Sequence, residues 1–527
     1  MDKPSNPFVT ALLTDFYEDT TVYAYWKDGK HNEDANFDLF FRECPFGGEF
    51  AIFAGLNEAL RFIMNFGFSE SDIEYLQSQL PNCEPEFFDW LSKLDSRHIT
   101  IRAIHEGSIV FPRVPLLSGS GPLGVIQLLE TTLLNLINYP TLIATNAARF
   151  RLLAPNMTLI DMGLRRAQGP DGALSGAKYS YLGGFDSTSN VLAGKMFGIP
   201  IKGTHPHSFV TSYSADELKN DQFSRRAIEY RNKICEILNL SGTNDGELAS
   251  FISFAKAFPD NFLSLVDTYN TMKSGIPNFM AVALVLAEDG HKPVGIRLDS
   301  GDLAFLSKEA RKIFHKVAGH FNISLFNATD LLIAASNDIN EQSLSAMQEQ
   351  GNELNILGIG THMITCQKQP ALGGVYKLVA IKGKSRIKIS ENIIKIPLPG
   401  RKAGYRLYGN DGSPILDLLI RDGEEPAPIP GEKILCCHPF DTHKRVYVTP
   451  RKVRCLHFPY IVNGIPSAEC ETTLEECRSR AKEELANLRD DHKRLTNPTP
   501  YKVSVSEKLF TELHNLWSSE APIEELN

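Results

Sequence analysis

Two histidines stand in a short polar stretch that could carry chemistry. Residues 203–210 read Gly-Thr-His-Pro-His-Ser-Phe-Val and contain His205 and His207. A histidine at the tip of a strand can act as a base, as a metal ligand or as the acceptor of a phosphoryl group. A single histidine is more often a hydrogen-bonded structural residue. Two at one strand end, in a chain with several polar strand ends, favour a chemical role.

Carboxylates and an arginine form a second candidate group. Asp267 stands in one polar stretch, and Arg297, Asp299 and Asp302 fall close together in another. Acids at this spacing can bind a sugar diol or a hydrated Mg²⁺, and they can stabilise positive charge that develops on a ribose ring. The structural alternative is capping of the following helix by Ser300 or Asp302, and we expect it to hold for one of them.

Two further stretches offer groups for an anion or an amide. Arg165 and Arg166 come just after an apolar run, and the planar fork of arginine suits a carboxylate or a phosphate, although a surface ion pair is the plainer explanation. Residues 183–190, which include Ser189, form a turn of small residues before a helix. Backbone N–H groups and hydroxyls in such a turn can hold an anion or an amide, but glycine-rich turns are common.

A glycine-rich loop completes the set. Gly358, Gly360 and Thr361 end another apolar run, and glycines let main-chain N–H groups approach a phosphate closely. Each of these stretches is weak evidence alone. Together they describe a site at strand ends with an arginine for a carboxylate or phosphate, a histidine, acids for a ribose and a phosphate loop. That set suits transfer to or from a phosphorylated sugar.

Repeated units of strand and helix must position these residues. Between about residues 157 and 365, short apolar runs end in polar or glycine residues and are separated by helical patterns. After Asp302 the apolar residues recur at close to the period of a helix, and Asn337 or Asp338 is well placed to cap the next one. This alternation is typical of parallel βα units, which close into a barrel or lie in an open sheet. Active sites gather where such strands end.

The two ends of the chain have a different texture, in which strand-like runs mix with helices and turns. We therefore predict an α/β barrel over residues 156–365, preceded by a sandwich segment over 1–155 and followed by another over 366–527. Near the end, Thr473 and Glu476 have the spacing of a capping box that opens an amphipathic helix.

The composition excludes several classes of protein. A chain of 527 residues, 43% of them hydrophobic, can bury a core in two or three domains, and a formal net charge of −9 argues against nucleic acid as the main partner. No run approaches the roughly 18 apolar residues that span a bilayer, and the first residues lack the apolar stretch of a signal peptide. Nine cysteines without metal-ligand spacing are most simply reduced thiols, so we expect a cytosolic protein.

Seven motifs, in order along the chain, give the sequence a family resemblance. They are TALLTDFY (residues 10–17), FRECPFGG (41–48), MGLRRAQGPDG (162–172), YLGGFD (181–186), HSFVT (207–211), RLDSGD (297–302) and GGVYKL (373–378). They closely resemble nicotinate phosphoribosyltransferase of the animal type. The resemblance implies a type II phosphoribosyltransferase fold, in which an irregular α/β barrel accompanies an α/β sandwich domain formed by the N- and C-terminal segments. It also implies a homodimer with active sites at the subunit interface.

The resemblance assigns roles to individual residues. His207 matches a histidine that ATP phosphorylates, and Asp267 and Asp299 match catalytic acids on the ribose and metal side. Mg²⁺ or Mn²⁺ is the implied metal, and ATP is the implied co-substrate. The other implied residues are substrate contacts: Tyr17 of the neighbouring subunit and Thr204 at nicotinate, Arg165 and Arg297 around the pyridine and phosphoribosyl groups, Ser189 in the turn, and Gly358, Gly360 and Thr361 at the 5-phosphate.

The implied reaction is the ATP-dependent, ligase-type joining of nicotinate to phosphoribosyl pyrophosphate. It gives nicotinate mononucleotide and pyrophosphate and begins the salvage of nicotinate into NAD. An enzyme of the same fold that uses nicotinamide is one competing hypothesis. That enzyme has an aspartate in the turn where this chain has Ser189 and Asn190, and a stacking phenylalanine where this chain has Met162.

Two more hypotheses come from different classes of protein. A non-catalytic relative that kept the fold should have lost part of the site, whereas His207, Arg297 and Asp299 are all present. A barrel lyase or aldolase would need a lysine at a strand end, and none of the candidate stretches supplies one. The residue at 205 is a histidine where relatives often have a small apolar residue, so a role for His205 stays open.

Overall fold

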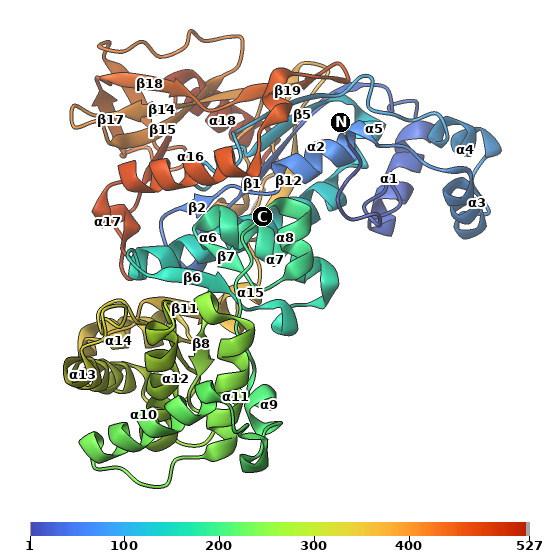
Figure 1. Ribbon diagram of the computed structural model, residues 1–527. Coiled ribbons are helices and arrows are strands. Elements are labelled where there is room, and N and C mark those ends of the chain that lie inside the picture. The colour runs from blue at the N-terminus through green and yellow to red at the C-terminus, as the bar shows by residue number, and fades with distance from the viewer. Residues whose placement is uncertain (1, 523–527) are drawn as a thin grey trace, which may run out of the picture. The chain divides into compact units, whose positions relative to one another are not determined.

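The chain folds into two compact units, and the computed structural model describes residues 2–522. Unit 1 comprises the residues up to Ala148, the short segment Leu182–Gly184 and the residues from Lys368 onward. Unit 2 comprises Arg149–Tyr181 and Phe185–Gln367. Unit 1 therefore joins both ends of the chain, as the resemblance implies, and Figure 1 shows the blue N-terminal and red C-terminal segments together in it.

Unit 1 is built on two mostly antiparallel sheets. The first has the strand order β13-β12-β1-β5-β3-β19-β20 and the second β17-β16-β21-β15-β14-β18, while β2 and β4 form a separate pair. Its strands are β1 (Asp34–Phe41), β2 (Ala51–Ile52), β3 (Thr100–Ala103), β4 (Ile109–Val110), β5 (Leu117–Pro122), β12 (Gly374–Ile381), β13 (Lys384–Ser385), β14 (Lys402–Tyr408), β15 (Pro414–Arg421), β16 (Ile434–Cys437), β17 (Arg445–Val448), β18 (Lys452–Cys455), β19 (Phe458–Val462), β20 (Ile465–Pro466) and β21 (Lys502–Val505). Leu407, Leu416 and Leu418 belong to the apolar core of the second sheet.

The helices of unit 1 come from both ends of the chain. They are α1 (Phe16–Lys27), α2 (Leu56–Met64), α3 (Glu70–Gln79), α4 (Pro85–Leu91), α5 (Leu123–Gln127), α6 (Glu130–Leu153, which continues into unit 2), α16 (Leu474–Asn487), α17 (Asp490–Lys493) and α18 (Glu507–Glu520). The predicted capping box at the start of α16 is confirmed, because Thr473 accepts from the backbone of Glu476 and the Glu476 carboxylate accepts from the backbone of Thr473.

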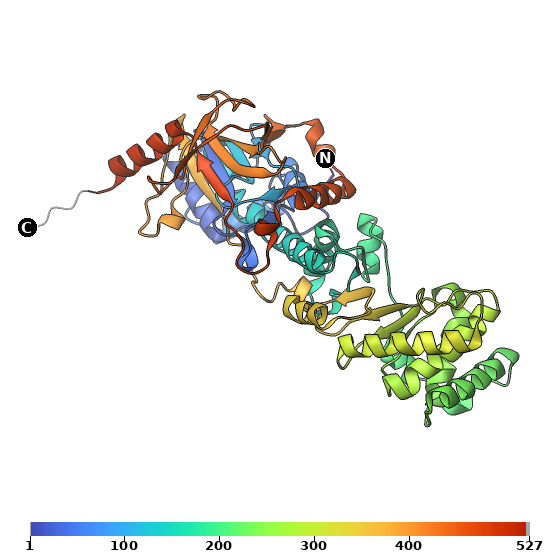
Figure 2. The same cartoon turned by 90° about the vertical axis from the view of Figure 1, so that its left-hand side faces the viewer.

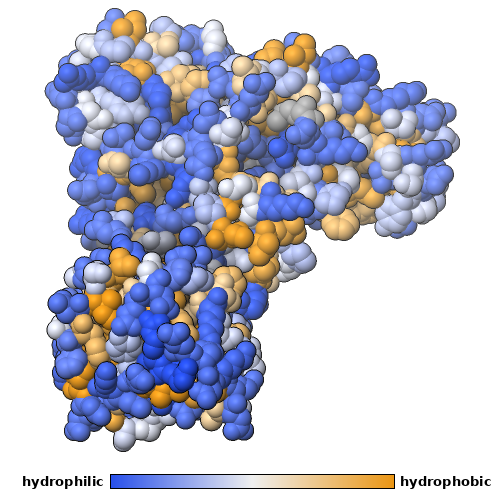
Figure 3. Space-filling view, viewed as in Figure 1, coloured by the Kyte–Doolittle hydropathy of each residue, from blue (hydrophilic) through white to orange (hydrophobic). Residues whose placement is uncertain are grey.

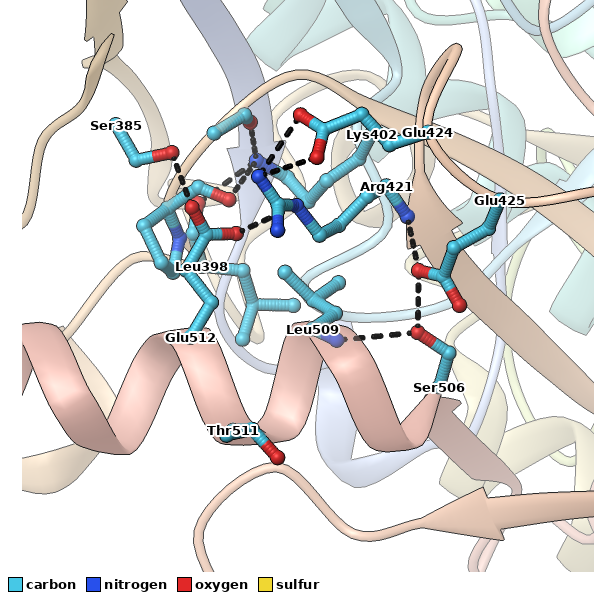
Figure 4. Close-up of polar contacts among 12 residues, drawn as sticks. Ser385, Leu398, Lys402, Arg421, Glu424, Glu425, Ser506, Leu509, Thr511 and Glu512 are labelled. Atoms are coloured by element: carbon cyan, nitrogen blue, oxygen red, sulfur yellow. Dashed lines mark hydrogen bonds and ion pairs between the residues drawn. The ribbon is translucent and has the colours of Figure 1, made fainter.

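The last helix, α18, is capped at its start and makes polar contacts with a strand of each sheet of unit 1. Ser506 caps α18 by accepting a hydrogen bond from the Leu509 backbone N–H at 3.2 Å, and the Leu509 side chain is fully buried. Glu512 accepts from Ser385 at 2.7 Å and pairs with Arg421 Nε at 3.1 Å (Figure 4). The last part of the chain therefore stabilises unit 1 by packing on β15.

Unit 2 is built on one parallel sheet with the order β7-β6-β11-β10-β9-β8. Its strands are β6 (Thr158–Asp161), β7 (Ser187–Thr188), β8 (Leu263–Leu265), β9 (Gly295–Leu298), β10 (Leu332–Ala335) and β11 (Ile356–Ile359). The predicted α/β class is confirmed, but the described strands form an open run and not a closed ring. The run predicted around Ile199 adds only an isolated bridge between Thr188 and Ile201, because it is short and contains Pro200, which has no N–H to donate.

Helices connect the parallel strands of unit 2. They are α7 (Gly169–Gly183), α8 (Val191–Phe197), α9 (His207–Thr211), α10 (Gln222–Leu238), α11 (Asp245–Ala257), α12 (Ile276–Glu288), α13 (Leu303–Phe321), α14 (Glu341–Gln350) and α15 (Thr361–Ile364). Figures 1 and 2 show the green and yellow helices of this unit gathered around its strands. Nearly every residue of α12 is buried, as expected of a helix that is apolar on all sides and packs against α10 and α11.

The predicted helix cap is confirmed for α13 and is wrong for α14. Asp302 caps α13 by accepting from the Phe305 N–H at 3.0 Å, as predicted. The prediction that Asn337 or Asp338 caps the next helix is wrong, because Asn340 is the cap of α14. Asn337 and Asp338 instead have φ values of 101° and 51°. Both residue types tolerate this left-handed region better than most, and here they turn the chain sharply out of β10.

Two expectations from composition can be compared with the structure. Within residues 2–522, no helix combines the length and the apolar character that a membrane crossing requires. On the face that Figure 3 shows, hydrophilic residues predominate and hydrophobic ones form small groups. None of the nine cysteines forms a disulfide in the structure.

Candidate functional site

The ends of two neighbouring strands bring the main candidate residues of unit 2 together. β8 and β9 pair in parallel, with Leu265 opposite Arg297. Asp267 follows β8 by two residues, and Asp299 comes directly after β9. Because parallel strands end at the same edge of a sheet, the two carboxylates meet there. The Asp299 N–H donates a hydrogen bond to Asp267 Oδ2 at 2.9 Å, so the two acids are in direct contact.

His207 joins this site from the first turn of α9. Its Nδ1 lies 3.1 Å from the Thr268 hydroxyl, while its Nε2 lies 3.8 Å from Asp267 Oδ1 and 3.6 Å from Asp299 Oδ2. The side chain is 43% exposed. An imidazole that is open to solvent on one side and faces two carboxylates on the other can receive a transferred group while the acids hold its orientation.

Each carboxylate has one oxygen held by the protein and one that faces the histidine. Asp267 Oδ2 accepts from Asp299 N and from Ser300 Oγ at 2.5 Å. Its Oδ1 is buried and has no hydrogen-bond partner in the structure. Asp299 Oδ1 accepts from the Ser336 hydroxyl and from Arg297 Nη2, the latter at 3.3 Å. Asp267 Oδ1 and Asp299 Oδ2 are therefore the oxygens left for a ligand.

The carboxylate pair fits a metal ion that is shared with a substrate. In residues 2–522, no group of three or more His, Cys, Asp or Glu side chains is arranged to hold a metal by itself. Mg²⁺ usually keeps several waters and is held by one or two carboxylates together with substrate phosphates. The orphaned Asp267 Oδ1 is the kind of hard oxygen ligand that such an ion needs.

Arg297 lies on β9 beside the carboxylates. Its Nε donates to Ser336 Oγ at 2.8 Å and its Nη2 to Asp299 Oδ1. The side chain is only 16% exposed, so its charge is held at the floor of the site. Arginine in such a place presents its remaining N–H groups to an anion with a fixed orientation.

The stretch before His207 is held against β8. The Thr204 hydroxyl donates to the carbonyl of Leu263, and His205 Nε2 accepts from the Leu265 N–H at 3.3 Å. His205 is 4% exposed, and burial lowers its pKa to about 4, so its ring is neutral at ordinary pH. His205 is therefore a buried, neutral ring held against β8, in contrast to the exposed His207.

The predicted phosphate loop follows β11. Gly358 ends this strand with Ile359, and Gly360 leads into Thr361, the first residue of α15. A Cβ at Gly358 would collide with the sulfur of Met162, so tight packing is a sufficient reason for glycine there. Binding of a phosphate by Gly358, Gly360 and Thr361 remains a prediction.

Arg165 and Ser189 lie at the ends of the other strands of the sheet. Arg165 is exposed in the turn after β6, and the Ser189 N–H donates to the Asp161 carbonyl at 2.8 Å just beyond β7. Asp161 is buried and accepts from Thr188 and Gly163, which fixes this turn. Among the described residues, no hydrogen bond or ion pair joins Arg165 or Ser189 to His207, so their roles remain predictions.

Tyr17 belongs to unit 1, where it stands in the first turn of α1 and is 48% exposed. Burial together with Glu130 and Glu18 raises the pKa of its phenol, so the hydroxyl stays protonated. Glu18 itself is fully buried. The amide of Gln127 donates to Glu18 at 2.8 Å and to Glu130 at 3.1 Å, and so bridges the two acids.

Glu18 gives the protein a testable pH dependence of stability. Burial raises its pKa to about 7. Because the unfolded chain loses this proton at about pH 4.3, stability falls as the pH rises from there to about 7. We expect Glu18→Gln, which cannot ionise, to melt increasingly above wild type between pH 5 and pH 8. Scanning calorimetry at both pH values checks this, with the exposed Glu70→Gln as the control. A melting difference that does not change with pH would contradict it.

Two residues of the site were not identified from the sequence. Thr268 orients His207, and Ser336 contacts both Arg297 and Asp299. Ser336 ends an apolar run, as the other candidates do, and this position was its only signal. The sequence pattern does not show which strand lies next to β9, so it could not single out this serine.

Comparison with known proteins places the chain in a family. Residues 12–138 match the family model of the nicotinate phosphoribosyltransferase N-terminal domain, and residues 401–513 match that of its C-terminal domain. A relative named nicotinate phosphoribosyltransferase from Dictyostelium discoideum is 49% identical, with 99% of this chain and 91% of that protein covered. The one from Homo sapiens is 44% identical, with 97% of each covered.

Solved structures agree with the sequence relatives. The crystal structure of human nicotinic acid phosphoribosyltransferase superposes with a TM-score of 0.85 at 43% identity, and the match covers 96% of this chain and all of that one. A nicotinate-nucleotide pyrophosphorylase from Pyrococcus furiosus shares the fold at 19% identity, with a TM-score of 0.57 over 90% of this chain and 95% of that one. Relatives of this name are 44–49% identical over nearly the full length, and both family models match. The chain therefore belongs to the nicotinate phosphoribosyltransferase family.

Proposed function

We propose that this protein joins nicotinate to phosphoribosyl pyrophosphate, with hydrolysis of ATP, to give nicotinate mononucleotide and pyrophosphate. The observation that supports it best is the placement of His207 Nε2 within 4 Å of both Asp267 and Asp299 at the ends of adjacent strands. With Arg297 beside them, one site offers groups for a phosphoryl transfer, a ribose and an anion. The family to which the chain belongs carries the same activity in its name.

The carboxylates would assist the transfer by their charge. The pyridine nitrogen of nicotinate forms a bond to C1 of the ribose while the bond from C1 to pyrophosphate breaks, and pyrophosphate leaves with the electron pair. Positive charge develops on the ribose ring in between, and Asp267 and Asp299 are correctly signed to stabilise it. Mg²⁺ or Mn²⁺, when bound through Asp267 and Asp299, would neutralise charge on the pyrophosphate.

The substrates would be held by the other strand-end groups. In this proposal Arg165, Ser189 and Thr204 contact nicotinate, Arg297 contacts the phosphoribosyl group, and Gly358, Gly360 and Thr361 hold the 5-phosphate. A homodimer would complete each site with Tyr17 of the partner subunit. The support for Arg297 is its fixed orientation beside Asp299. The others rest on their positions at the strand ends and on the resemblance.

The decisive experiment is an assay of the purified protein for nicotinate mononucleotide and pyrophosphate, with and without ATP. Nicotinate and nicotinamide are offered separately with phosphoribosyl pyrophosphate and Mg²⁺. We expect rapid turnover of nicotinate that ATP stimulates. Preference for nicotinamide would identify the nicotinamide-using enzyme of the same fold. Absence of pyrophosphate release from either base would favour a non-catalytic relative.

His207 should carry the coupling to ATP. A phosphoryl group on this imidazole would place negative charge beside Asp267 and Asp299, where it would strengthen the binding of a metal and, through the metal, that of the sugar pyrophosphate. We therefore expect His207→Ala to lose stimulation by ATP and keep slow transfer. The measurement is the ratio of rates with and without ATP. Thr268→Val is the comparison variant. It removes only the hydroxyl contact to His207 Nδ1, so it should retain part of the stimulation by ATP. Equal stimulation in His207→Ala and wild type would refute the assignment.

A further inference from the structure

One buried serine, Ser336, makes hydrogen bonds with both Arg297 and Asp299. Ser336 comes directly after β10 and is 5% exposed. Its Oγ accepts from Arg297 Nε at 2.8 Å and donates to Asp299 Oδ1. Its backbone N–H donates to the Leu298 carbonyl at 2.9 Å. The serine is therefore fixed by the backbone at the same level as the two residues that it contacts.

Without this serine, the two charged groups have a better partner in each other. An arginine and a carboxylate in reach of one another favour the paired geometry, with two parallel N–H to oxygen bonds. Arg297 and Asp299 make only a single contact, from Nη2 to Oδ1 at 3.3 Å. The Ser336 hydroxyl accepts from Arg297 Nε and donates to Asp299 Oδ1. Arg297 Nε therefore bonds to the serine and not to the carboxylate, and the second bond of a paired geometry is not formed.

The atoms that this arrangement leaves over are the ones a substrate would use. Asp299 Oδ2 lies 3.6 Å from His207 Nε2. Arg297 Nη1 has no hydrogen-bond or ion-pair partner in the part of the chain that the structure describes. A carboxylate oxygen and a guanidinium edge are thus kept apart and free to contact a ribose and a phosphate group.

The local backbone explains why a serine can stand here. β9 and β10 pair in register up to Leu298 and Ala335, so the next residue of β10 lies beside the residue that follows β9. Asn337 and Asp338 then turn the chain away with positive φ values. Ser336 is the last residue that can reach both charged side chains, and a short hydroxyl side chain serves as donor and acceptor at once.

We propose that Ser336 is a positioning residue, which keeps Arg297 and Asp299 from closing into a paired ion bridge and so holds them open for the phosphoribosyl substrate. The proposal rests on the proposed function and deepens it. It predicts that Ser336 acts on the sugar pyrophosphate and not on nicotinate, because its two partners are the arginine and the ribose-side acid. It also predicts that only the hydroxyl matters.

Replacing Ser336 by alanine tests this in the full-length protein. We expect the KM for phosphoribosyl pyrophosphate to rise by roughly 10- to 100-fold, the range for losing hydrogen bonds to charged groups. The KM for nicotinate should change little. Ser336→Thr keeps the hydroxyl and should restore much of the affinity. Titration calorimetry of phosphoribosyl pyrophosphate binding, with Mg²⁺ and without nicotinate, gives a second measurement. It does not depend on turnover or on the folding of Ser336→Thr.

Ser307→Ala is the matched control. The Ser307 hydroxyl is fully buried, donates to the Ala304 carbonyl at 2.8 Å and accepts from Glu353 N at 3.0 Å, yet it lies on α13 outside the site. It should lower the melting temperature without changing KM. The inference would be overturned if Ser336→Ala kept the wild-type KM and affinity for phosphoribosyl pyrophosphate. It would also be overturned if Ser336→Ala and Ser307→Ala changed them equally. An inactive wild type would instead contradict the proposed function, and the binding measurement would still decide on Ser336.

Discussion

Replacing Asp299 by asparagine is expected to lower kcat/KM for nicotinate mononucleotide formation by about 10²- to 10³-fold, the range seen when one preorganised electrostatic group is removed from an active site. Asparagine has nearly the same shape and can still accept the hydrogen bond from Ser336. It removes the negative charge that lies 3.6 Å from His207 Nε2 and that is correctly signed for a ribose cation. Steady-state kinetics with both substrates varied, together with the melting temperature, measure the effect.

The same loop contains a matched control for this substitution. Asp302 lies three residues further on, is exposed, and caps α13 through the Phe305 N–H. Asparagine is about as good a helix cap as aspartate, so Asp302→Asn removes the same charge without removing the cap. We expect this variant to retain most activity. If both variants lost activity equally, the general charge of the loop would be responsible, and Asp299 would not have the role proposed.

The local part of this site could be predicted from sequence because each candidate ends an apolar run. Asp267 and Asp299 lie far apart in the chain, yet each follows a segment with the texture of a buried parallel strand, whereas the run before His207 forms only an isolated bridge and His207 reaches the site from α9. Parallel strands in one sheet end at one edge, so position along the chain translates into position in space. The sequence could not distinguish His205 from His207, because both stand in the same short polar stretch. The structure shows that His205 is buried and His207 is exposed.

Other features depend on which strands become neighbours, and periodicity does not encode that. The order β7-β6-β11-β10-β9-β8 places β10 between β9 and β11, although the sequence separates these strands by whole helices. Ser336 owes its two partners to this order alone. The wrong prediction that Asn337 caps α14 has a different cause. Asparagine is favoured both as a helix cap and in a left-handed turn, and Asn337 adopts the turn while Asn340 caps the helix.

The largest effect on stability is expected in unit 1, where a charged pair is buried between adjacent strands. Arg406 on β14 stands opposite Asp417 on β15 and donates to it from Nε at 2.8 Å and from Nη2 at 2.9 Å. Both residues are nearly inaccessible, and Tyr501 donates to the same carboxylate at 3.0 Å. We expect Asp417→Ala to destabilise the protein by about 3–5 kcal/mol, because it breaks the two-bond pair of a buried guanidinium and leaves that guanidinium with Glu484, 3.1 Å away, as its carboxylate partner. Urea unfolding followed by circular dichroism measures this loss.

The origin of that loss can be separated from the value of the pair itself. Removing both charges, in Arg406→Met with Asp417→Leu, also removes the buried cation that has lost its two-bond partner, so the double variant should be more stable than Asp417→Ala. Asp422→Ala breaks the partly exposed pair with Arg102 and should cost clearly less, because water can solvate the remaining arginine. A double variant as unstable as Asp417→Ala would mean that the network, which also includes Glu484 at 3.1 Å from Arg406, contributes net stability. The buried pair would then stabilise the second sheet and not merely fix the register of its strands.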